Sequence, residues 1–204
     1  LVASNVSITD EWFAAPRPRQ PGQPCRLVFV GSLERPYKGL DVLLRALSEI
    51  GRADTWHLDV VGDGARRSQL MQLSESLQLD DQVTWHGNVD RESVRKLLQH
   101  GHVFVMPSLT EGLPRALVEA MACGLACVGT RVGGIPELLP EEALVRPGDT
   151  NELAAAVLRL ITDEERRFTA ANRCHSDSRL YAKAAIDQRI EEFAAKVVTT
   201  VEQR

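Results

Sequence analysis

Short apolar runs alternate with segments of helical periodicity along most of this chain, and this alternation constrains the fold more than any other feature. Runs rich in β-branched and aromatic residues predict six strands, at 26–31, 57–62, 82–87, 102–108, 125–130 and 143–148. Patterns typical of helices, such as the spacing of Leu40, Leu43, Leu44, Leu47 and Ile50, occur at 39–51, 65–79, 91–101, 114–123 and 151–163. This order predicts an α/β fold: a Rossmann-like, doubly wound parallel sheet with helices on both faces.

The regions before and after the alternating part differ from it. Residues 14–24 hold four prolines and a glycine, so we assign residues 1–24 to a leading segment and a proline-rich connection. Residues 25–162 form the Rossmann-like domain, and residues 163–204 are predicted as C-terminal helices that pack on it. One apolar stripe of this tail needs a partner surface: Ile186, Ile190, Phe193, Ala194, Val197 and Val201. Because the chain starts at Leu1 without an initiator methionine, we expect a piece of a longer protein.

Composition excludes several classes of protein. With 44% hydrophobic and 25% charged residues, the chain is typical of globular proteins, and a net charge of −4 argues against a nucleic-acid binder. It has no apolar run long enough for a transmembrane helix. Its cysteines are scattered and lack zinc-ligand spacing, which fits a reducing cytosol: Cys25, Cys123, Cys127 and Cys174. The histidines likewise show no zinc spacing and are interpreted as structural or surface residues: His57, His86, His100, His102 and His175.

Glycine-containing loops follow most of the predicted strands. In a doubly wound sheet, ligands bind outside the carboxyl ends of the strands, and there the chain carries "GSLERPYKG", "GDGARR", "GNVDRE", "SLTEGLPR" and "TRVGGIPE". Each glycine alone is ordinary turn chemistry, but together they predict one edge where backbone approaches something closely.

The best-known nucleotide motifs do not match these loops. Gly62 and Gly64 fit the first two glycines of a dinucleotide fingerprint, but Arg67 stands at the third, and Asp81 precedes a strand instead of ending one. The sequence has no P-loop and no Asp-x-Asp pair, so it predicts phosphate chemistry without a metal ion. An NAD-dependent oxidoreductase stays an alternative, weakened by the missing glycine.

Two carboxylates stand out in "EGLPRALVEAMACG". Pro114 suits a first helical position, and the predicted helix ends at Cys123, before Gly124. Glu111 therefore lies in the loop before the helix, while Glu119 lies inside an almost wholly apolar helix, where a carboxylate needs a partner. That partner is either Arg115, one turn earlier, or a pair of hydroxyl groups such as a ribose presents.

Cations and a helix terminus could hold a phosphate at the same edge. The helix after Pro114 points its N-terminus at the predicted crevice, and helix N-termini bind anions. Lys38 and Arg35 follow the first strand, where they are either partners of a diphosphate or solvated turn cations.

These residues resemble the C-terminal, donor-binding domain of retaining glycosyltransferases of the GT-B fold, most closely those of family four. The resemblance covers roughly residues 25 to 196 and is carried by "FVGSLERPYKGLDVLLRAL", "VVGDG", "VTWHGNV" and "VFVMPSLTEGLPRALVEAMACGLACVGTRVGGIPELL". It implies transfer of a sugar from a nucleoside diphosphate sugar with retention of configuration. Family frequency favours UDP over GDP in the donor, and no further cofactor is implied.

The resemblance also implies roles for individual residues. Glu111 would contact the donor sugar, and Lys38 would stabilise the leaving diphosphate, which makes these two the catalytic pair. Glu119 would hold the ribose hydroxyls. The implied donor-binding set is Ser32, Arg35, Gly62, Asn88, Val89, Gly112, Leu113, Pro114, Arg115 and Glu119, with Asn88 and Val89 bordering the base and no metal ligand.

Two departures from the family pattern matter. The family often has an arginine where this chain has Ser32, so either Arg35 substitutes for it or the second cation is missing. The N-terminal acceptor domain of the GT-B fold is absent from this sequence. We therefore expect donor binding with weak or no turnover, a cytoplasmic location, and peripheral membrane contact only through the absent half.

Other classes of protein use similar parts. A glycoside hydrolase also needs two carboxylates, but it has no need of a glycine-edged phosphate crevice. A non-catalytic nucleotide-binding module is the remaining alternative, and a chain lacking its acceptor domain would behave as one.

Overall fold

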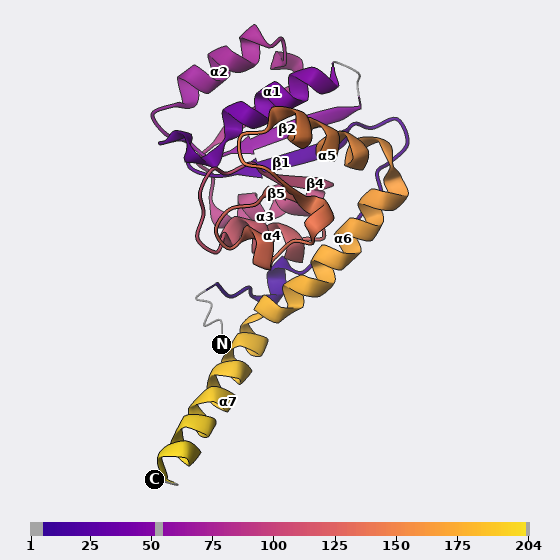
Figure 1. The fold of residues 1–204 in the computed structure, drawn as a ribbon. Helices are drawn as coiled ribbons and strands as arrows, with labels where there is room; N and C mark the ends of the chain where they lie inside the picture. Colours follow the sequence, from indigo (N-terminus) through magenta and orange to yellow (C-terminus); the bar gives the residue numbers. More distant parts are fainter. Residues whose placement is uncertain (1–5, 52–54, 203–204) are drawn as a thin grey trace.

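The structure, a computed structural model, describes residues 6–51 and 55–202. Its six strands are β1 (Cys25–Val30), β2 (Trp56–Val61), β3 (Val83–Gly87), β4 (Val103–Met106), β5 (Ala126–Thr130) and β6 (Leu144–Val145). They form one parallel sheet in the order β3-β2-β1-β4-β5-β6 (Figure 1). The predicted doubly wound sheet is thereby confirmed, although β6 is only two residues long.

Helices follow the strands as the periodicity predicts. The α-helices are α1 (Leu40–Ile50), α2 (Arg67–Ser76), α3 (Arg91–His100), α4 (Arg115–Ala122), α5 (Thr150–Thr162), α6 (Glu164–Ser178) and α7 (Lys183–Glu202). Short 3-10 turns lie at Asp10–Trp12, Pro36–Lys38, Asp80–Gln82, Ile135–Glu137, Glu141–Ala143 and Arg179–Tyr181. Figure 1 shows α1, α2 and α5 on one side of the sheet and α3 and α4 on the other.

Each face of the sheet has its own hydrophobic core. The first core joins alternate strand residues such as Leu27 and Leu58 to Leu43 and Leu47 of α1 and to α5. The second joins the opposite strand face to α3 and α4, and α4 is apolar on nearly all sides because it lies buried there. Burial of both faces explains why the strand sequences are continuous apolar runs instead of alternating ones.

The chain segment before the sheet belongs to the second core. Val6, Ile8 and Trp12 are at most 7% exposed and pack with that core. Ile8 N donates to the carbonyl of Tyr181 at 2.8 Å, and Lys183 N donates to the carbonyl of Ile8 at 2.8 Å. The beginning and the helical tail therefore run side by side at one corner of the molecule.

Helix α7 projects from this corner away from the sheet (Figure 1). Ile186, near its start, is 7% exposed and packs on the body. Ile190 and Phe193, which belong to the predicted apolar stripe, are 59% and 47% exposed. The side chains of Val197 and Val201 lie outside the described part of the structure.

The start of α4 differs in detail from the prediction. Pro114 has φ −79° and ψ 111°, so it is the N-cap and not the first helical residue, and α4 runs from Arg115 to Ala122. The carbonyl of Pro114 accepts from Leu117 N at 3.2 Å and Val118 N at 3.4 Å. Its carbonyl thus joins the helix while its own backbone stays extended, which is the definition of a cap residue.

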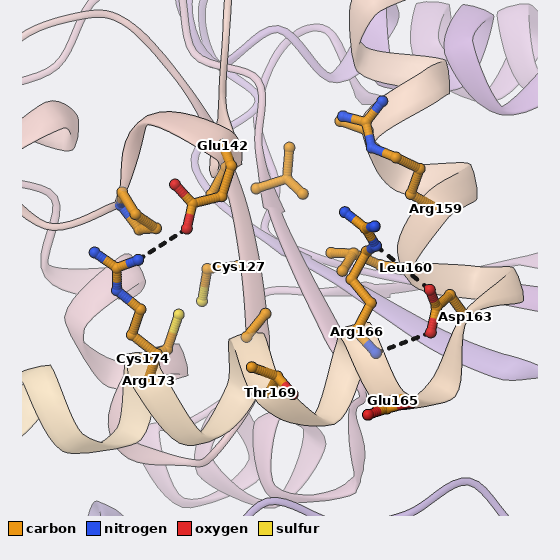
Figure 2. Close-up of a pocket in the computed structure, with 15 residues that line it drawn as sticks. Cys127, Glu142, Arg159, Leu160, Asp163, Glu165, Arg166, Thr169, Arg173 and Cys174 are labelled. Carbon is orange, nitrogen blue, oxygen red and sulfur yellow. Dashed lines mark hydrogen bonds and ion pairs between the residues drawn. The ribbon is translucent and has the colours of Figure 1, made fainter.

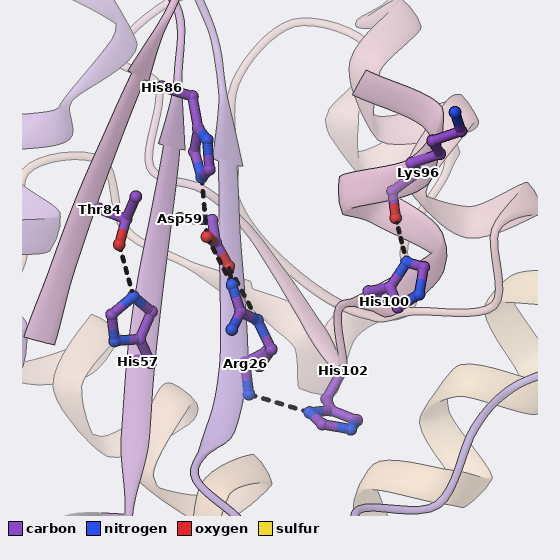
Figure 3. Close-up of polar contacts among 8 residues, drawn as sticks. All are labelled: Arg26, His57, Asp59, Thr84, His86, Lys96, His100 and His102. Carbon is purple, nitrogen blue, oxygen red and sulfur yellow. Dashed lines mark hydrogen bonds and ion pairs between the residues drawn. The ribbon is translucent and has the colours of Figure 1, made fainter. Parts of the chain in front are cut away.

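A buried charge lies on the sheet face that α3 and α4 cover only in part. Asp59 of β2 is 1% exposed, and Arg26 Nη2 donates to both of its oxygens, at 2.7 and 2.5 Å (Figure 3). His86 Nε2 lies 2.8 Å from the same carboxylate. Pairing and hydrogen bonding of this kind are what a buried carboxylate requires. The apolar run at 57–62 predicted the strand but not the buried charge within it.

Candidate functional site at the carboxyl edge of the sheet

The predicted site residues cluster at the point where the strand order reverses. Lys38 lies in the loop after β1, and Glu111 lies in the loop after β4, which is the neighbour of β1 in the sheet. From these two strands the chain continues to opposite sides of the sheet, and such a switch point opens a crevice at the carboxyl edge.

Close backbone packing fixes the two loops against each other. Gly39 has φ +68°, and a Cβ atom there would lie 2.0 Å from the carbonyl oxygen of Pro107. Leu109 N also donates to the carbonyl of Tyr37 at 2.7 Å. Only glycine fits a left-handed conformation at such a distance, so the positions on either side of Gly39 and Pro107 are set before any ligand binds.

This packing brings Lys38 and Glu111 into direct contact. Lys38 Nζ lies 2.5 Å from Glu111 Oε1, and the two side chains are 18% and 9% exposed. The hydroxyl of Ser108 donates to the same oxygen at 2.8 Å. Thr130 at the end of β5 in turn donates to the carbonyl of Ser108 at 2.5 Å. Four residues from three strand ends thus form one connected polar cluster.

Ser108 and Thr130 were not among the predicted site residues. Both are 1% exposed and lie directly at the ends of buried strands. Buried hydroxyls need hydrogen-bond partners, so a serine or threonine that ends an apolar strand run was the available signal. Their place in the cluster indicates that they orient Glu111.

Glu119 has the partner that a purely structural interpretation predicts. Arg115 Nε donates to Glu119 Oε1 at 3.0 Å, and the Glu119 side chain is 10% exposed. Burial raises the pKa of Glu119, while the hydrogen bond and charge of Arg115 and the charge of Arg91 oppose the rise. The arginine itself is 55% exposed at its side chain, so it covers the carboxylate from the solvent side.

Neither carboxylate uses both of its oxygens within the protein. Glu111 and Glu119 each accept hydrogen bonds at Oε1 only, from the three donors named above. Each carboxylate therefore keeps one oxygen, Oε2, that accepts no hydrogen bond from the described residues and can accept one from a ligand.

In the loops after β4 and β5, Gly112 is the glycine for which neither backbone conformation nor close packing requires the absence of a side chain. A Cβ atom there would meet nothing within 4 Å, and its φ is not positive. In contrast, Gly133 has φ +51° and would place a Cβ 1.9 Å from the carbonyl oxygen of Glu111. The neighbouring Gly134 N donates to the carbonyl of Gly112 at 2.8 Å, which fixes the loop without covering it.

Helix α4 presents an uncapped N-terminus beside this cluster. The side chains of Asp90, Asp149 and Asp163 cap α3, α5 and α6 by accepting backbone N–H bonds. No side chain caps α4, and its first turn holds no acidic residue. Its terminal N–H groups and positive dipole end thus remain available to an anion.

The remaining predicted residues lie at the same edge but outside the polar cluster. Ser32 and Arg35 are exposed; the Ser32 hydroxyl accepts from Glu34 N at 3.3 Å, and Arg35 forms no ion pair with any described residue. Asn88 is exposed and Val89 partly exposed, in the loop before α3. Gly62 packs against Gly31, where a Cβ would lie 1.9 Å from its carbonyl oxygen.

Arg91 is a further residue of this edge that was not among the predicted site residues. It begins α3, and its charge acts on the pKa of Glu119. Its guanidinium lies 5.1 Å from the ring centroid of Trp12, which fits a cation–π contact. Trp12 of the leading segment therefore contacts the cation whose charge acts on Glu119, and no local sequence pattern predicts this contact.

A separate pocket of about 460 Å³ lies between β5, α5 and α6 (Figure 2). Arg159, Arg166 and Arg173 line it together with Cys127 and Cys174, and none of the predicted site residues does. Within residues 6–51 and 55–202, no group of three or more His, Cys, Asp or Glu side chains could hold a metal ion. None of the helices in that part of the chain combines the length and apolar character needed to cross a membrane.

Comparison with known proteins gives a consistent assignment. The model of the family "Glycosyl transferases group 1" matches residues 24–163, which is more than half of the chain. A curated relative is the phosphatidylinositol N-acetylglucosaminyltransferase gpi3 subunit of Schizosaccharomyces pombe, 36% identical over 129 residues, which are 62% of this chain and 28% of that protein.

Two solved structures share the fold. Sucrose-phosphate synthase from Thermosynechococcus elongatus superposes with a TM-score of 0.82 at 27% identity, over 95% of this chain and 52% of that one. The Anabaena protein HepE, solved in complex with UDP and glucose, gives a TM-score of 0.77 at 25% identity, over 85% of this chain and 49% of that one. The chain thus spans about half of these solved chains and 28% of the S. pombe relative.

Proposed function

The chain belongs to the Glycosyl transferases group 1 family, and on that premise we propose that it binds the nucleoside diphosphate sugar donor of a glycosyltransferase. The complete enzyme transfers the sugar to an acceptor with retention of configuration. UDP is the favoured nucleotide and GDP the second choice, and the complex of HepE with UDP and glucose supports this order. The observation that carries the proposal is the Lys38–Glu111 pair at the switch point of the sheet.

Lys38 and the N-terminus of α4 act on the diphosphate. When the bond between sugar and phosphate breaks, negative charge develops on the leaving diphosphate, and preorganised positive groups stabilise it. An ammonium group has three N–H donors, so Lys38 can keep Glu111 and still reach a phosphate oxygen. Three features of this chain stabilise that negative charge without a metal ion: the Lys38 ammonium, the uncapped amides of α4 and the dipole of α4.

Glu111 and Gly112 meet the donor sugar. Glu111 offers one free oxygen to a sugar hydroxyl, while Lys38 and Ser108 hold the other. Gly112 leaves open space beside it, which allows the sugar to approach the backbone. Leu113 and Pro114 complete the loop that leads into α4.

Glu119 binds the ribose. A carboxylate can accept from two vicinal hydroxyls, and Glu119 has one oxygen free and one that only the exposed Arg115 occupies. Asn88 and Val89, in the loop before α3, border the base. Gly62, Ser32 and Arg35 lie at the outer side of the phosphate region.

Binding of UDP, GDP and NAD to matched variants tests the ribose role. We expect UDP to bind the unaltered chain and Glu119→Gln to weaken it by at least about tenfold, equal to about 1.4 kcal/mol. The control Arg45→Gln, which changes an exposed arginine of α1 outside the site, should change the affinity by less than about threefold. Titration calorimetry measures both. Equal affinity of Glu119→Gln and the unaltered chain would show that Glu119 serves Arg115 alone, and binding of NAD in place of UDP would assign an oxidoreductase.

The division of labour in the complete protein is also a proposal. We place acceptor binding in an N-terminal domain, with residues 25–162 binding the donor, residues 163–204 returning toward that domain and residues 1–24 leading from it. We place the enzyme in the cytoplasm, with peripheral membrane contact through the other half. The name of the S. pombe relative contains phosphatidylinositol, a membrane lipid, which supports the membrane contact. Joining the two halves and assaying transfer distinguishes an enzyme from a nucleotide-binding module.

A further inference from the structure

A second group of basic side chains lies at the opposite, amino-terminal edge of the sheet. There the proline-rich connection, the start of β1 and the end of α3 surround a cavity of about 510 Å³. Five basic residues line it: Arg17, Arg26, Lys96, His100 and His102. The other lining residues are uncharged, and the volume falls within the range of about 300–1,000 Å³ that is usual for ligand sites.

The wall of this cavity contains no carboxylate, although the chain as a whole has a net charge of −4. Two acids outside the wall pair with basic side chains of it. Asp59 is buried between Arg26 and His86, and Glu92 forms a surface pair with Lys96, in which both side chains are 62% exposed. The Lys96 ammonium has three N–H donors, so it keeps donors beyond this pair. Glu164 lines a small adjoining cavity together with Arg17 and His102, and it accepts from Arg19 N at 3.2 Å.

Arg17 leaves most of its hydrogen-bonding capacity to a ligand. Its Nη1 donates to the carbonyl of Gln99 at 3.4 Å, and it forms no ion pair with any residue of the described ranges. Prolines at positions 16 and 18 restrict the backbone on either side of it. A guanidinium held in this way has a fork of donors that matches the geometry of a phosphate group.

His102 contributes a neutral donor of fixed tautomer. Arg26 N donates to His102 Nδ1 at 2.9 Å, so in the neutral ring the proton is on Nε2 (Figure 3). Burial, followed by the charges of Arg167, Arg19, Arg26 and Arg17, lowers the pKa of His102 to about 4. The ring is therefore neutral near pH 7, and its Nε2–H has no acceptor among the described residues. The same four arginines create the positive potential that an anion would experience.

We propose that this cavity binds a phosphate group, at a site separate from the donor site. The Arg17 fork, the Lys96 ammonium and the His102 Nε2–H would donate to its oxygens. Strand β1, six residues long, separates the two edges of the sheet by roughly 20 Å, since a strand rises about 3.3 Å per residue. The group can belong to a soluble phosphorylated molecule or to a phospholipid head group, which share this chemistry.

Inorganic phosphate, titrated at constant ionic strength, tests the site on the full 204-residue chain. The imidazole resonances of His100 and His102 report binding locally. We expect saturable shifts in the unaltered chain and equally in Lys38→Gln, which disables the donor site. The double variant Arg17→Gln/Lys96→Gln should bind phosphate at least about tenfold more weakly, because charge-assisted hydrogen bonds are lost. The control Arg45→Gln/Arg159→Gln removes the same charge from exposed, unpaired side chains and should bind normally.

Vesicle flotation separates the two sources of the phosphate group. Vesicles of phosphatidylcholine alone are compared with vesicles that contain about 30% phosphatidylserine, which carry a negative surface potential. If the unaltered chain floats with the anionic vesicles and only Arg17→Gln/Lys96→Gln does not, the ligand is a lipid head group. If phosphate gives saturable shifts but the chain does not float with these vesicles, the ligand is a soluble phosphorylated molecule. The proposal is overturned if phosphate shifts neither imidazole saturably, or if the site variant and its control bind phosphate equally well. Neither result depends on UDP binding, so the proposed donor site stands or fails separately.

Discussion

At the scale of single residues, Lys38 occupies its position before a donor arrives. Flexible lysines lose side-chain entropy when they are immobilised by a ligand, and this loss reduces affinity. Here the contact with Glu111, at 2.5 Å, already restrains the side chain in the unliganded protein. The pair therefore holds Lys38 where the proposed contact with a diphosphate requires it.

Replacing Lys38 by glutamine separates its two roles. We expect Lys38→Gln to weaken UDP binding by at least about tenfold, and to lower the free energy of unfolding by about 1–3 kcal/mol, because Glu111 loses a charged partner. Calorimetry and denaturant unfolding measure the two effects. Lys183→Gln, on the exposed part of α7, is the control and should change neither. A loss of stability without a loss of affinity would make the pair purely structural.

His102 gives a prediction for the pH dependence of stability. Burial and the nearby arginines lower its pKa from 6.5 to about 4 in the folded protein. Between these two values the unfolded chain binds a proton that the folded chain does not, so the free energy of unfolding decreases as the pH falls from 6.5 to 4. In His102→Gln this contribution is absent, and the decrease of Tm over that window should be smaller. The control His100→Gln should follow the unaltered chain; identical curves for all three proteins would contradict the assignment.

The contacts between individual residues were the least predictable part of the site. Glu119 was singled out because a carboxylate in an apolar run is locally unusual, Glu111 because it lies in the loop before that helix, and Lys38 because it follows the first strand. Their partners were not, since Lys38 and Glu111 are 73 positions apart and meet only through the packing of two loops. Arg35 was predicted as a second cation from its position alone, and the structure leaves it exposed and unpaired.

At the scale of elements, the loops after β4 and β5 position the site as one unit. Gly133 allows its loop to reach the carbonyl of Glu111, and Gly134 donates to the carbonyl of Gly112. Gly112 and Gly133 are thus neighbours in different surroundings. Gly112 faces open space, whereas Gly133 packs against the backbone of Glu111.

Alanine substitution should distinguish these two glycines. Gly133→Ala forces a Cβ into backbone at a positive φ, so we expect a loss of stability of more than about 1 kcal/mol together with weaker donor binding. Gly112→Ala should leave the melting temperature unchanged and weaken the binding of a UDP-sugar more than the binding of UDP itself. Thermal unfolding and calorimetry measure both. If Gly112→Ala binds a UDP-sugar normally, the open space at Gly112 is not the sugar subsite.

Strands and helices were predictable because their apolar periodicity reports burial directly. All six strands and the order of helices follow the apolar runs, since each face of the sheet is covered. Capping is subtler: Asp90, Asp149 and Asp163 end loops as N-caps, while Pro114 takes the cap position of α4 without offering a side-chain acceptor. Helices α1 and α2 likewise begin without a side-chain cap, at Gly39 and Arg66.

At the scale of the whole molecule, the segment before the sheet is part of the folded unit. A sequence rich in proline predicted a connection at residues 14–24, but no local pattern placed Ile8 and Trp12 in the core on the α3–α4 side. Their burial depends on helices that follow about a hundred residues later, as the packing of Trp12 near Arg91 shows.

Core and tail substitutions should differ in their effect. Trp12→Ala should lower the free energy of unfolding by about 3–5 kcal/mol, because Trp12 is 1% exposed and its removal leaves a cavity. Ile190→Gln/Phe193→Gln changes exposed side chains of α7 and should shift stability by less than about 0.5 kcal/mol. Urea unfolding compares them. In the complete protein, the tail variant should weaken the contact between the two proposed halves and make the chain between them easier to cleave by limited proteolysis. An unchanged cleavage pattern would show that the apolar stripe does not contact the other half.

The pairing of Ile8 with Tyr181 and Lys183 has a mechanical consequence. The chain that leads to Ile8 and the chain that leaves along α7 pass through the same corner of the molecule. In the division of labour proposed above, both connections to the other half would therefore lie side by side, and the orientation of that half would depend on this single corner.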